Sequence, residues 1–192
     1  MNAYLLAVNV VRACWTIFLV VWLVTGFSTK RTVYRESSAR RLRYWLLLIG
    51  AYVLLAYSHH LPFPFDHRLF PRLPQIAWLG AALCLAGLVF CVWARFVLGR
   101  NWSGVVTLKE EHELIVRGPY RCVRHPIYTG LITMYLGTAI VAGYFGGVIG
   151  IVLVFASFWI KLGDEEKLMS RQFPGEYADY QARVKRIVPF LF

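Results

Sequence analysis

Two clusters of polar and aromatic residues flank one long apolar run, and their residue types suit the binding of a small charged molecule. The first cluster, residues 118–130, reads Gly-Pro-Tyr-Arg-Cys-Val-Arg-His-Pro-Ile-Tyr-Thr-Gly and precedes the run. The second, residues 161–167, reads Lys-Leu-Gly-Asp-Glu-Glu-Lys and follows it. Carboxylates suit ribose hydroxyls, an ammonium or a sulfonium, and aromatic faces suit a cation or a purine ring. We expect the chemistry where the two clusters meet.

The first cluster has the features of a helix start that binds an anion. Pro126 is well placed as the first helical residue, where its missing N–H costs nothing. His125 then lies at the cap. The free backbone N–H groups of a helix start, together with its positive dipole, can hold a carboxylate. Tyr128 lies in the first turn, so we expect its ring to project near the same site.

The second cluster places a cation and a carboxylate on one helical face. Lys161 and Glu165 are four residues apart, which brings them to the same side of a helix. Glu165 and Glu166 are adjacent and point in different directions, so we expect one to face the site and the other to face water. Taken alone, this pattern is typical of a solvated helix end. It indicates a site only if the chain returns to the first cluster.

The apolar run between the clusters predicts that return. Residues 127–160 comprise 34 positions, which as one helix would extend roughly 50 Å against a hydrocarbon core of about 30 Å. Residues 143–147 read Gly-Tyr-Phe-Gly-Gly near the middle of the run, and glycine clusters mark turns. We therefore predict two antiparallel helices joined by a tight turn, with both clusters on one face of a membrane.

The composition is that of a membrane protein: 58% of the 192 residues are hydrophobic, against 45–50% in soluble domains. Three further apolar segments, 4–27, 42–57 and 76–98, are candidate spans. The first lacks a basic flank and is too long for a signal peptide, so we keep it as a helix. The predicted fold class is all-α: a single membrane domain over 1–192 with five transmembrane helices, the last two a hairpin. A cytoplasmic loop and C-terminal helices would complete the cofactor site.

The net charge of +11 follows the loops. Basic residues concentrate in the first loop, the third loop and the tail, while the second loop has only Arg68 and Arg72 and the fourth has none. This alternation obeys the positive-inside rule and predicts an outer amino terminus, with the carboxyl terminus and the site cytoplasmic. Attraction to anionic membrane lipids explains the charge, so no nucleic-acid partner is expected.

Other candidate groups carry less information. The four cysteines form no CxxC pair, and Cys84 and Cys91, seven apart, are expected to be small buried residues on one helix face. His59, His60 and His67 lie in a proline-rich loop whose spacing matches no metal pattern, so no metal site is expected. Arg12 lies within the first span, where a charge is costly. A structural partner and a functional role are left open for it.

The motif Arg124-His125-Pro126-x-Tyr128-x-Gly130, the hairpin and Glu165-Glu166 resemble the isoprenylcysteine carboxyl methyltransferase family of membrane enzymes. The likeness extends over residues 95–192, which would form the catalytic core, while residues 1–75 are variable spans that resemble nothing specific. It implies S-adenosylmethionine as methyl donor and a lipid-like or prenylated acceptor that enters from the bilayer. By motif match the cofactor-binding residues are His112, Glu113, Leu114, Ile115, Tyr120, His125, Pro126, Ile127, Tyr128 and Glu165.

The resemblance assigns Lys161 to catalysis, as the cation that places the acceptor, and includes one departure. Related sequences often have arginine at this position, and lysine offers a point charge rather than a planar fork. The acceptor therefore stays open among a prenylcysteine carboxylate, a quinone-like compound and a phospholipid amine. Two other functions also remain: an NADPH-dependent reductase of the sterol type, which shares the Arg-His-Pro-x-Tyr pattern, and a non-catalytic lipid-binding protein.

Overall fold

The computed structural model describes residues 2–27, 32–35, 37–102, 107–109 and 113–188, which are mainly helical. The elements run in this order: α1 Ala3–Gly26, β1 Thr32–Arg35, α2 Ser38–Tyr57, the 3-10 turn η1 Ser58–His60, α3 Pro74–Leu98, η2 Gly99–Asn101, β2 Thr107–Lys109, η3 Gly118–Arg121, α4 Pro126–Ala142, α5 Phe145–Gln172 and α6 Glu176–Arg183. The all-α prediction holds for the described residues except a short antiparallel ribbon, β1–β2, which pairs Arg35 with Thr107.

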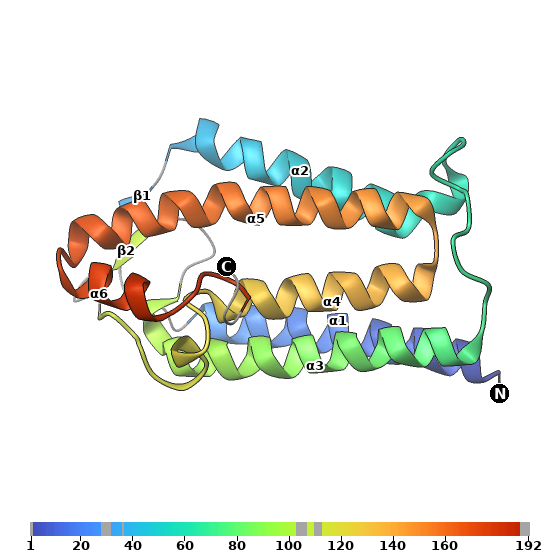
Figure 1. Cartoon of the computed structure of the whole chain (residues 1–192), viewed down its shortest axis with the longest axis horizontal. Helices are drawn as coiled ribbons and strands as arrows, with labels where there is room; N and C mark the ends of the chain where they lie inside the picture. Colours follow the sequence, from blue (N-terminus) through green and yellow to red (C-terminus); the bar gives the residue numbers. More distant parts are fainter. Residues whose placement is uncertain (1, 28–31, 36, 103–106, 110–112, 189–192) are drawn as a thin grey trace.

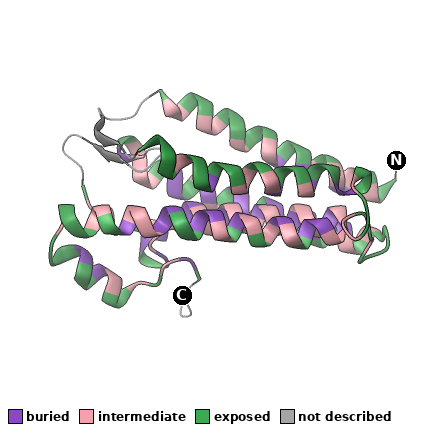
Figure 2. Cartoon of the chain, turned by 90° about the horizontal axis from the view of Figure 1, so that it is seen from above, coloured by how far each residue is buried: buried purple, intermediate pink, exposed green. Residues whose placement is uncertain are grey.

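The long helices form two groups that lie side by side (Figure 1). In one group α3 packs between α1 and α4, and in the other α2 packs along α5. The turn between α4 and α5 lies at the same end of the bundle as the amino terminus. Helix α6 and the ribbon lie at the other end, which we call the α6 end. Buried residues follow the inward faces of the helices, and exposed residues, many of them apolar, cover the outer faces (Figure 2).

The long apolar run folds as a helical hairpin, as its length predicts. Helix α4 ends at Ala142, and Gly143 caps it in the left-handed conformation with φ of 72°. Glycine adopts this conformation without steric penalty, which explains the position of the turn. Helix α5 starts at Phe145 and has 28 residues. At about 42 Å it outreaches a hydrocarbon core of about 30 Å, so one end of it projects beyond the core.

Helices α3 and α4 approach each other closely along a stripe of small residues. The stripe consists of Gly80, Cys84, Gly87 and Cys91 on α3 and Gly130 and Gly137 on α4. A methyl group on Gly87 would lie 2.5 Å from the carbonyl oxygen of Gly130, closer than any side chain can sit. Cys84 and Cys91 are fully buried, which confirms their description as small core residues. Such stripes let helix backbones pack tightly within a bilayer.

Three described helical segments are long and apolar enough to cross a membrane: Ala3–Gly26, Pro74–Asn101 and Phe145–Gln172. The protein is therefore an integral membrane protein. Helix α4 is apolar but has only 17 residues, about 26 Å. The predicted span 42–57 is a helix that begins earlier, at Ser38, so that its first turns include Arg40 and Arg41.

A buried arginine ties the first helix to the third at the α6 end. The residue Arg95 is only 2% exposed. Its guanidinium donates to the carbonyl oxygens of Thr25 and Gly99, both at 2.7 Å, and lies 4.7 Å from the centre of the Trp102 ring. Both carbonyls lie at helix ends, where they also accept from the backbone N–H groups of Phe27 and Trp102, so the arginine is an additional donor to each.

Candidate active site

A cavity of about 1210 Å³ lies between the two helix groups. Ten of the predicted site residues line it: Glu113, Leu114, Ile115, Tyr120, His125, Pro126, Ile127, Tyr128, Lys161 and Glu165. The remaining one, His112, lies outside the described residues. Along α4 the lining extends from Pro126 to Ala142, about 24 Å. The structure thus brings the predicted residues to one cavity, while their contacts with a ligand stay a prediction.

Tyr128 and Glu165 meet at the α6 end of this cavity. The Tyr128 hydroxyl donates to Glu165 Oε1 at 2.5 Å, and His125 Nδ1 lies 3.7 Å from Glu165 Oε2. The Phe158 ring packs edge-on against Tyr128 with ring centres 5.0 Å apart. The start of α4 and the distal part of α5 are therefore juxtaposed, which is the geometry that the hairpin predicts.

Lys161 lies between two aromatic rings in the same part of the cavity. Its residue is 9% exposed. Its ammonium nitrogen is 5.3 Å from the centre of the Tyr44 ring and 5.5 Å from that of Tyr128, within cation–π range. Rings on either side restrict where the ammonium can lie. An anionic group entering the cavity would therefore meet a cation with a defined position.

Sequence reasoning missed Tyr44, which comes from α2. The residue is 2% exposed and lines the cavity. Its carbonyl oxygen accepts a hydrogen bond from the Ser157 hydroxyl at 2.9 Å, which links α2 to α5. The first two spans resemble no known motif, so the available signal was weak: one aromatic residue beside the basic start of a helix.

Glu166 faces inward, so the expectation that one of the two glutamates faces water is wrong. Its side chain is 6% exposed, against 22% for Glu165. Its Oε1 lies 2.8 Å from Arg124 Nη2 and 3.0 Å from His125 Nε2, and its Oε2 accepts from Arg186 Nε at 3.1 Å. Three cationic or potentially cationic groups therefore surround one buried carboxylate, which explains its burial.

The start of α4 is less open to an anion than its sequence indicates. His125 is the cap and Pro126 the first helical residue, as predicted. However, the N–H groups of Arg124 and His125 donate to the carbonyl oxygens of Lys185 at 2.8 Å and Arg186 at 3.1 Å. Since proline has no N–H, few donors remain at this helix start. The prediction that its backbone binds a carboxylate loses most of its basis.

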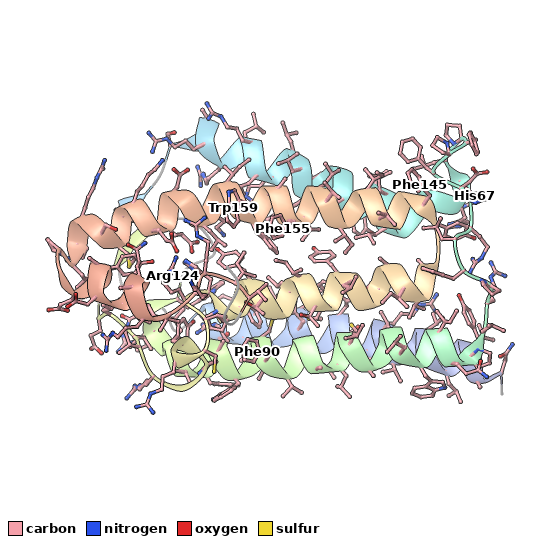
Figure 3. All side chains as sticks on the ribbon, viewed as in Figure 1. His67, Phe90, Arg124, Phe145, Phe155 and Trp159 are labelled. Atoms are coloured by element: carbon pink, nitrogen blue, oxygen red, sulfur yellow. The ribbon has the colours of Figure 1, made fainter. Side chains whose placement is uncertain are left out.

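Residues 184–188, which we call the C-terminal strap, occupy those donors. The strap pairs with the chain just before α4 through a parallel bridge between Val123 and Lys185. The Thr129 hydroxyl donates to the carbonyl oxygen of Ile187 at 2.7 Å. The Arg124 guanidinium also donates to the Val184 carbonyl, and Figure 3 shows Arg124 at the α6 end. The strap is thus fastened to the residues that begin α4.

Helix α6 holds the cavity lining through two tyrosines. Tyr177 and Tyr180 are 2% and 4% exposed. The Tyr180 hydroxyl donates to the carbonyl oxygen of Tyr120 at 2.6 Å. Burial raises the pKa of Tyr180, an effect that the charge of Arg124 opposes only partly, so the hydroxyl stays a donor at neutral pH. The packing fixes Tyr120 in the cavity wall.

Arg12 faces the same cavity from α1. Its residue is exposed and lines the cavity. Its carbonyl oxygen accepts from the Thr16 hydroxyl at 3.0 Å. The alternative left open by the sequence, a buried structural partner, is not present among the described residues. Nor do the described residues contain a group of three or more metal-ligating side chains.

A model of the phospholipid methyltransferase family matches residues 76–176, just over half of the chain. The chain belongs to this family. The matched segment runs from α3 to the first residue of α6, so it contains the helical hairpin and both polar clusters. The resemblance noted in the sequence is thereby confirmed, and the protein is a membrane methyltransferase.

Named relatives of this methyltransferase extend over more of the chain. A probable protein-S-isoprenylcysteine O-methyltransferase of Oryza sativa subsp. indica is 30% identical over 175 residues, which are 88% of this chain and 87% of the rice protein. The protein-S-isoprenylcysteine O-methyltransferase of Rattus norvegicus is 31% identical over 150 residues, 73% of this chain. The matched part is 51% of the rat protein, so the chain spans about half the length of that relative.

The fold of this methyltransferase is similar to a solved one. The structure of a eukaryotic intramembrane Ras methyltransferase, isoprenylcysteine carboxyl methyltransferase, aligns with a TM-score of 0.55 and 22% identity. The alignment covers 82% of this chain and 55% of that one. The arrangement of helices is thus shared, although the solved protein is considerably longer.

Proposed function

We propose that this chain transfers a methyl group from S-adenosylmethionine to the polar end of a lipid-like acceptor, with the carboxylate of a prenylated cysteine as the class that fits best. One observation carries the proposal. The described residues predicted to hold the donor converge at one end of a cavity whose remaining length suits an apolar tail. The names of the rice and rat relatives support the same acceptor class.

The residues at the α6 end fit the donor. When bound, S-adenosylmethionine supplies a methyl group on a positively charged sulfur. The Glu165 carboxylate and the Tyr128 ring are groups that favour a cation beside them. Tyr120 and Ile127 belong to a hydrophobic cluster together with Ile115, which offers an apolar bed for a purine ring. Carboxylate and apolar bed lie in the same cavity.

Lys161 places the acceptor. A carboxylate is ionised at neutral pH, so its oxygen already carries the electron pair for the new bond to carbon, and no general base is needed. The requirement is alignment with the methyl group, and Lys161 supplies a cation whose position the two tyrosine rings restrict. An amine acceptor would have to lose a proton and would be repelled by this ammonium. The site therefore favours an anionic acceptor.

Five crossings, α1 to α5, are our proposal for the topology, with α2 and the short α4 completing the three long spans. The basic residues of the described loops and tail gather at the α6 end, which supports a cytoplasmic site and an outer amino terminus. We treat residues 1–192 as one membrane domain whose catalytic core is 95–192. The lipid acceptor then reaches the cavity from the bilayer.

Ligand binding tests the proposal and separates it from its alternatives. Calorimetry on the detergent-solubilised chain with S-adenosylmethionine, S-adenosylhomocysteine and NADPH should show binding of the two adenosyl ligands alone. Binding of NADPH alone would overturn the proposal in favour of a reductase. Binding of none of the three would favour a non-catalytic lipid-binding protein.

Substitutions then locate the donor site. Glu165→Ala and His125→Ala should each weaken binding of S-adenosylhomocysteine about tenfold or more, because each removes a group at the α6 end of the cavity. His67→Ala should leave the affinity unchanged, since His67 lies at the opposite end of the bundle (Figure 3). Unchanged affinity in both Glu165→Ala and His125→Ala would remove the proposed site.

A further inference from the structure

A connected series of polar contacts runs from the C-terminal strap to the cavity. It begins at Arg186 in the strap, which pairs with Glu166 on α5. Glu166 Oε1 lies 3.0 Å from Nε2 of His125, and the other ring nitrogen, Nδ1, lies 3.7 Å from Glu165 Oε2. Glu165 in turn accepts from the Tyr128 hydroxyl. The two glutamates thus lie on opposite edges of one imidazole ring.

Of these two carboxylates, Glu165 lines the cavity and Glu166 does not. Glu166 is therefore placed to act on a bound donor only through another residue. We propose that Glu166 is a positioning residue of the donor site: it holds the proton of His125 on Nε2 and orients the ring, so that Nδ1 faces Glu165. The inference rests on the proposed function of the cavity as the donor site.

The geometry around His125 supports this role. His125 is the cap residue of α4, directly before Pro126, so its backbone is already held by the helix and the strap. What the backbone leaves undetermined is the ring orientation and the nitrogen that carries the proton. A carboxylate within hydrogen-bond distance of Nε2 determines both, because it accepts only from a protonated nitrogen.

Glu166 is itself held in place by the surrounding cations. Arg124 donates through Nε at 2.9 Å and through Nη2 at 2.8 Å to the same oxygen that faces His125. The other oxygen accepts from Arg186. Charge-assisted contacts on both oxygens restrict the carboxylate to one orientation. It therefore presents a defined acceptor to the histidine, which a freely rotating side chain would not.

Glu166→Gln tests the inference with two measurements on the full chain. The charged or titratable groups that face the His125 ring are Glu165 and Glu166 from α5 and Tyr128 from α4, while Arg124 and Arg186 contact Glu166. Loss of the Glu166 charge should lower the fraction of His125 that carries its proton on Nε2, as read from the 15N chemical shifts of the two ring nitrogens in histidine-labelled protein, with the signal assigned by His125→Asn. Affinity for S-adenosylhomocysteine should fall about tenfold in calorimetry.

Two controls separate positioning from general stability. Lys185→Gln removes a charge from the strap on an exposed side chain, so it should leave the position of the His125 proton unchanged and the affinity within about twofold. Glu176→Gln repeats the glutamate-to-glutamine change of Glu166→Gln on the exposed first residue of α6. It should alter neither measurement. If Glu166→Gln yields no folded protein, Glu166→Asp replaces it, because the shorter side chain keeps the charge but withdraws the carboxylate from His125 Nε2, and the same two results are expected.

The inference is overturned if the distribution of the proton between the two ring nitrogens of His125 stays unchanged in the Glu166 variant. It is equally overturned if Lys185→Gln weakens binding as much as Glu166→Gln, because the strap rather than the histidine would then carry the effect. Should the unsubstituted chain bind no adenosyl ligand, the proposed function fails. The location of the His125 proton still decides whether Glu166 positions the ring.

Discussion

Two neighbouring glutamates in α5, Glu165 and Glu166, show how strongly the local environment determines the role of a residue. Glu165 contacts the Tyr128 hydroxyl and lines the cavity, while Glu166 is enclosed by Arg124, His125 and Arg186. Adjacent helical positions differ by about 100° in direction, so one carboxylate meets the cavity and the other meets the residues before α4. The same chemical group therefore serves once as a candidate ligand contact and once as an anchor.

At this scale Lys161 gives a direct test of acceptor placement. Lys161→Ala should lower kcat by about a hundredfold with little change in affinity for S-adenosylhomocysteine, because it misplaces the acceptor and leaves the donor site intact. Steady-state kinetics with a prenylcysteine acceptor, alongside calorimetry, provides both values. Lys167→Ala is the matched control, since that side chain is 76% exposed. A loss of donor affinity with normal kcat would show that our role for Lys161 is wrong.

At the level of helices, the close pairing of α3 with α4 depends on glycine at the contact positions, where no side chain separates the two backbones. The stripe of small residues brings the backbones together at two levels, near Gly80 with Gly137 and near Gly87 with Gly130. Close approach of this kind gives α4 a fixed position relative to α3. Because α4 carries His125 and Tyr128 at its start, the stripe also sets where those side chains lie.

Gly87→Val should therefore destabilise the fold. The added side chain meets the Gly130 carbonyl and the Met134 backbone, and we expect a loss of about 1–3 kcal/mol, the usual cost of overpacking. Thermal unfolding in detergent measures it. Gly163→Ala is the control, because a methyl group there meets nothing within 4 Å. Equal melting temperatures for Gly87→Val and the unsubstituted chain would contradict the close packing.

The sequence predicts the hairpin well, because length and glycine placement are local properties. It also predicts the cap at His125, because the proline that follows marks the first residue of the helix. It does not predict the strap, since the bridge from Val123 to Lys185 joins residues far apart in the chain. Nor does it show which of Glu165 and Glu166 is buried, because that depends on where the C-terminal strap places Arg186 in the fold.

At the scale of the whole molecule, the cavity lies between two packing units. One unit contains α1, α3 and α4, and the other contains α2 and α5. Residues from both units line the cavity, including Trp15 on α1 and Leu48 on α2. The two units are joined directly by the short turn after α4. The site is therefore an interface within one chain rather than a pocket inside one unit.

Cysteine accessibility tests the proposed orientation of the whole chain. Cys122 is exposed, while Cys14, Cys84 and Cys91 are buried. A membrane-impermeant maleimide should therefore label the chain only after the cytoplasmic side becomes accessible. In a Cys122→Ser background, Phe63→Cys should label in intact cells. Phe63 is 78% exposed and belongs to the segment that joins α2 to α3, which lies at the end of the bundle opposite α6 (Figure 1). Labelling of Cys122 in intact cells would reverse the topology.

Because two packing units share the cavity wall, the geometry of the site depends on the thickness and lateral pressure of the surrounding bilayer. Lateral pressure in a bilayer acts on each unit separately, so compressing or thinning the lipid changes the spacing of Tyr44 and Tyr128, which come from different units and flank Lys161. Acyl-chain length and detergent choice should then alter catalytic efficiency without any change in sequence. For an enzyme built this way, the surrounding lipid is a determinant of the geometry of its own active site.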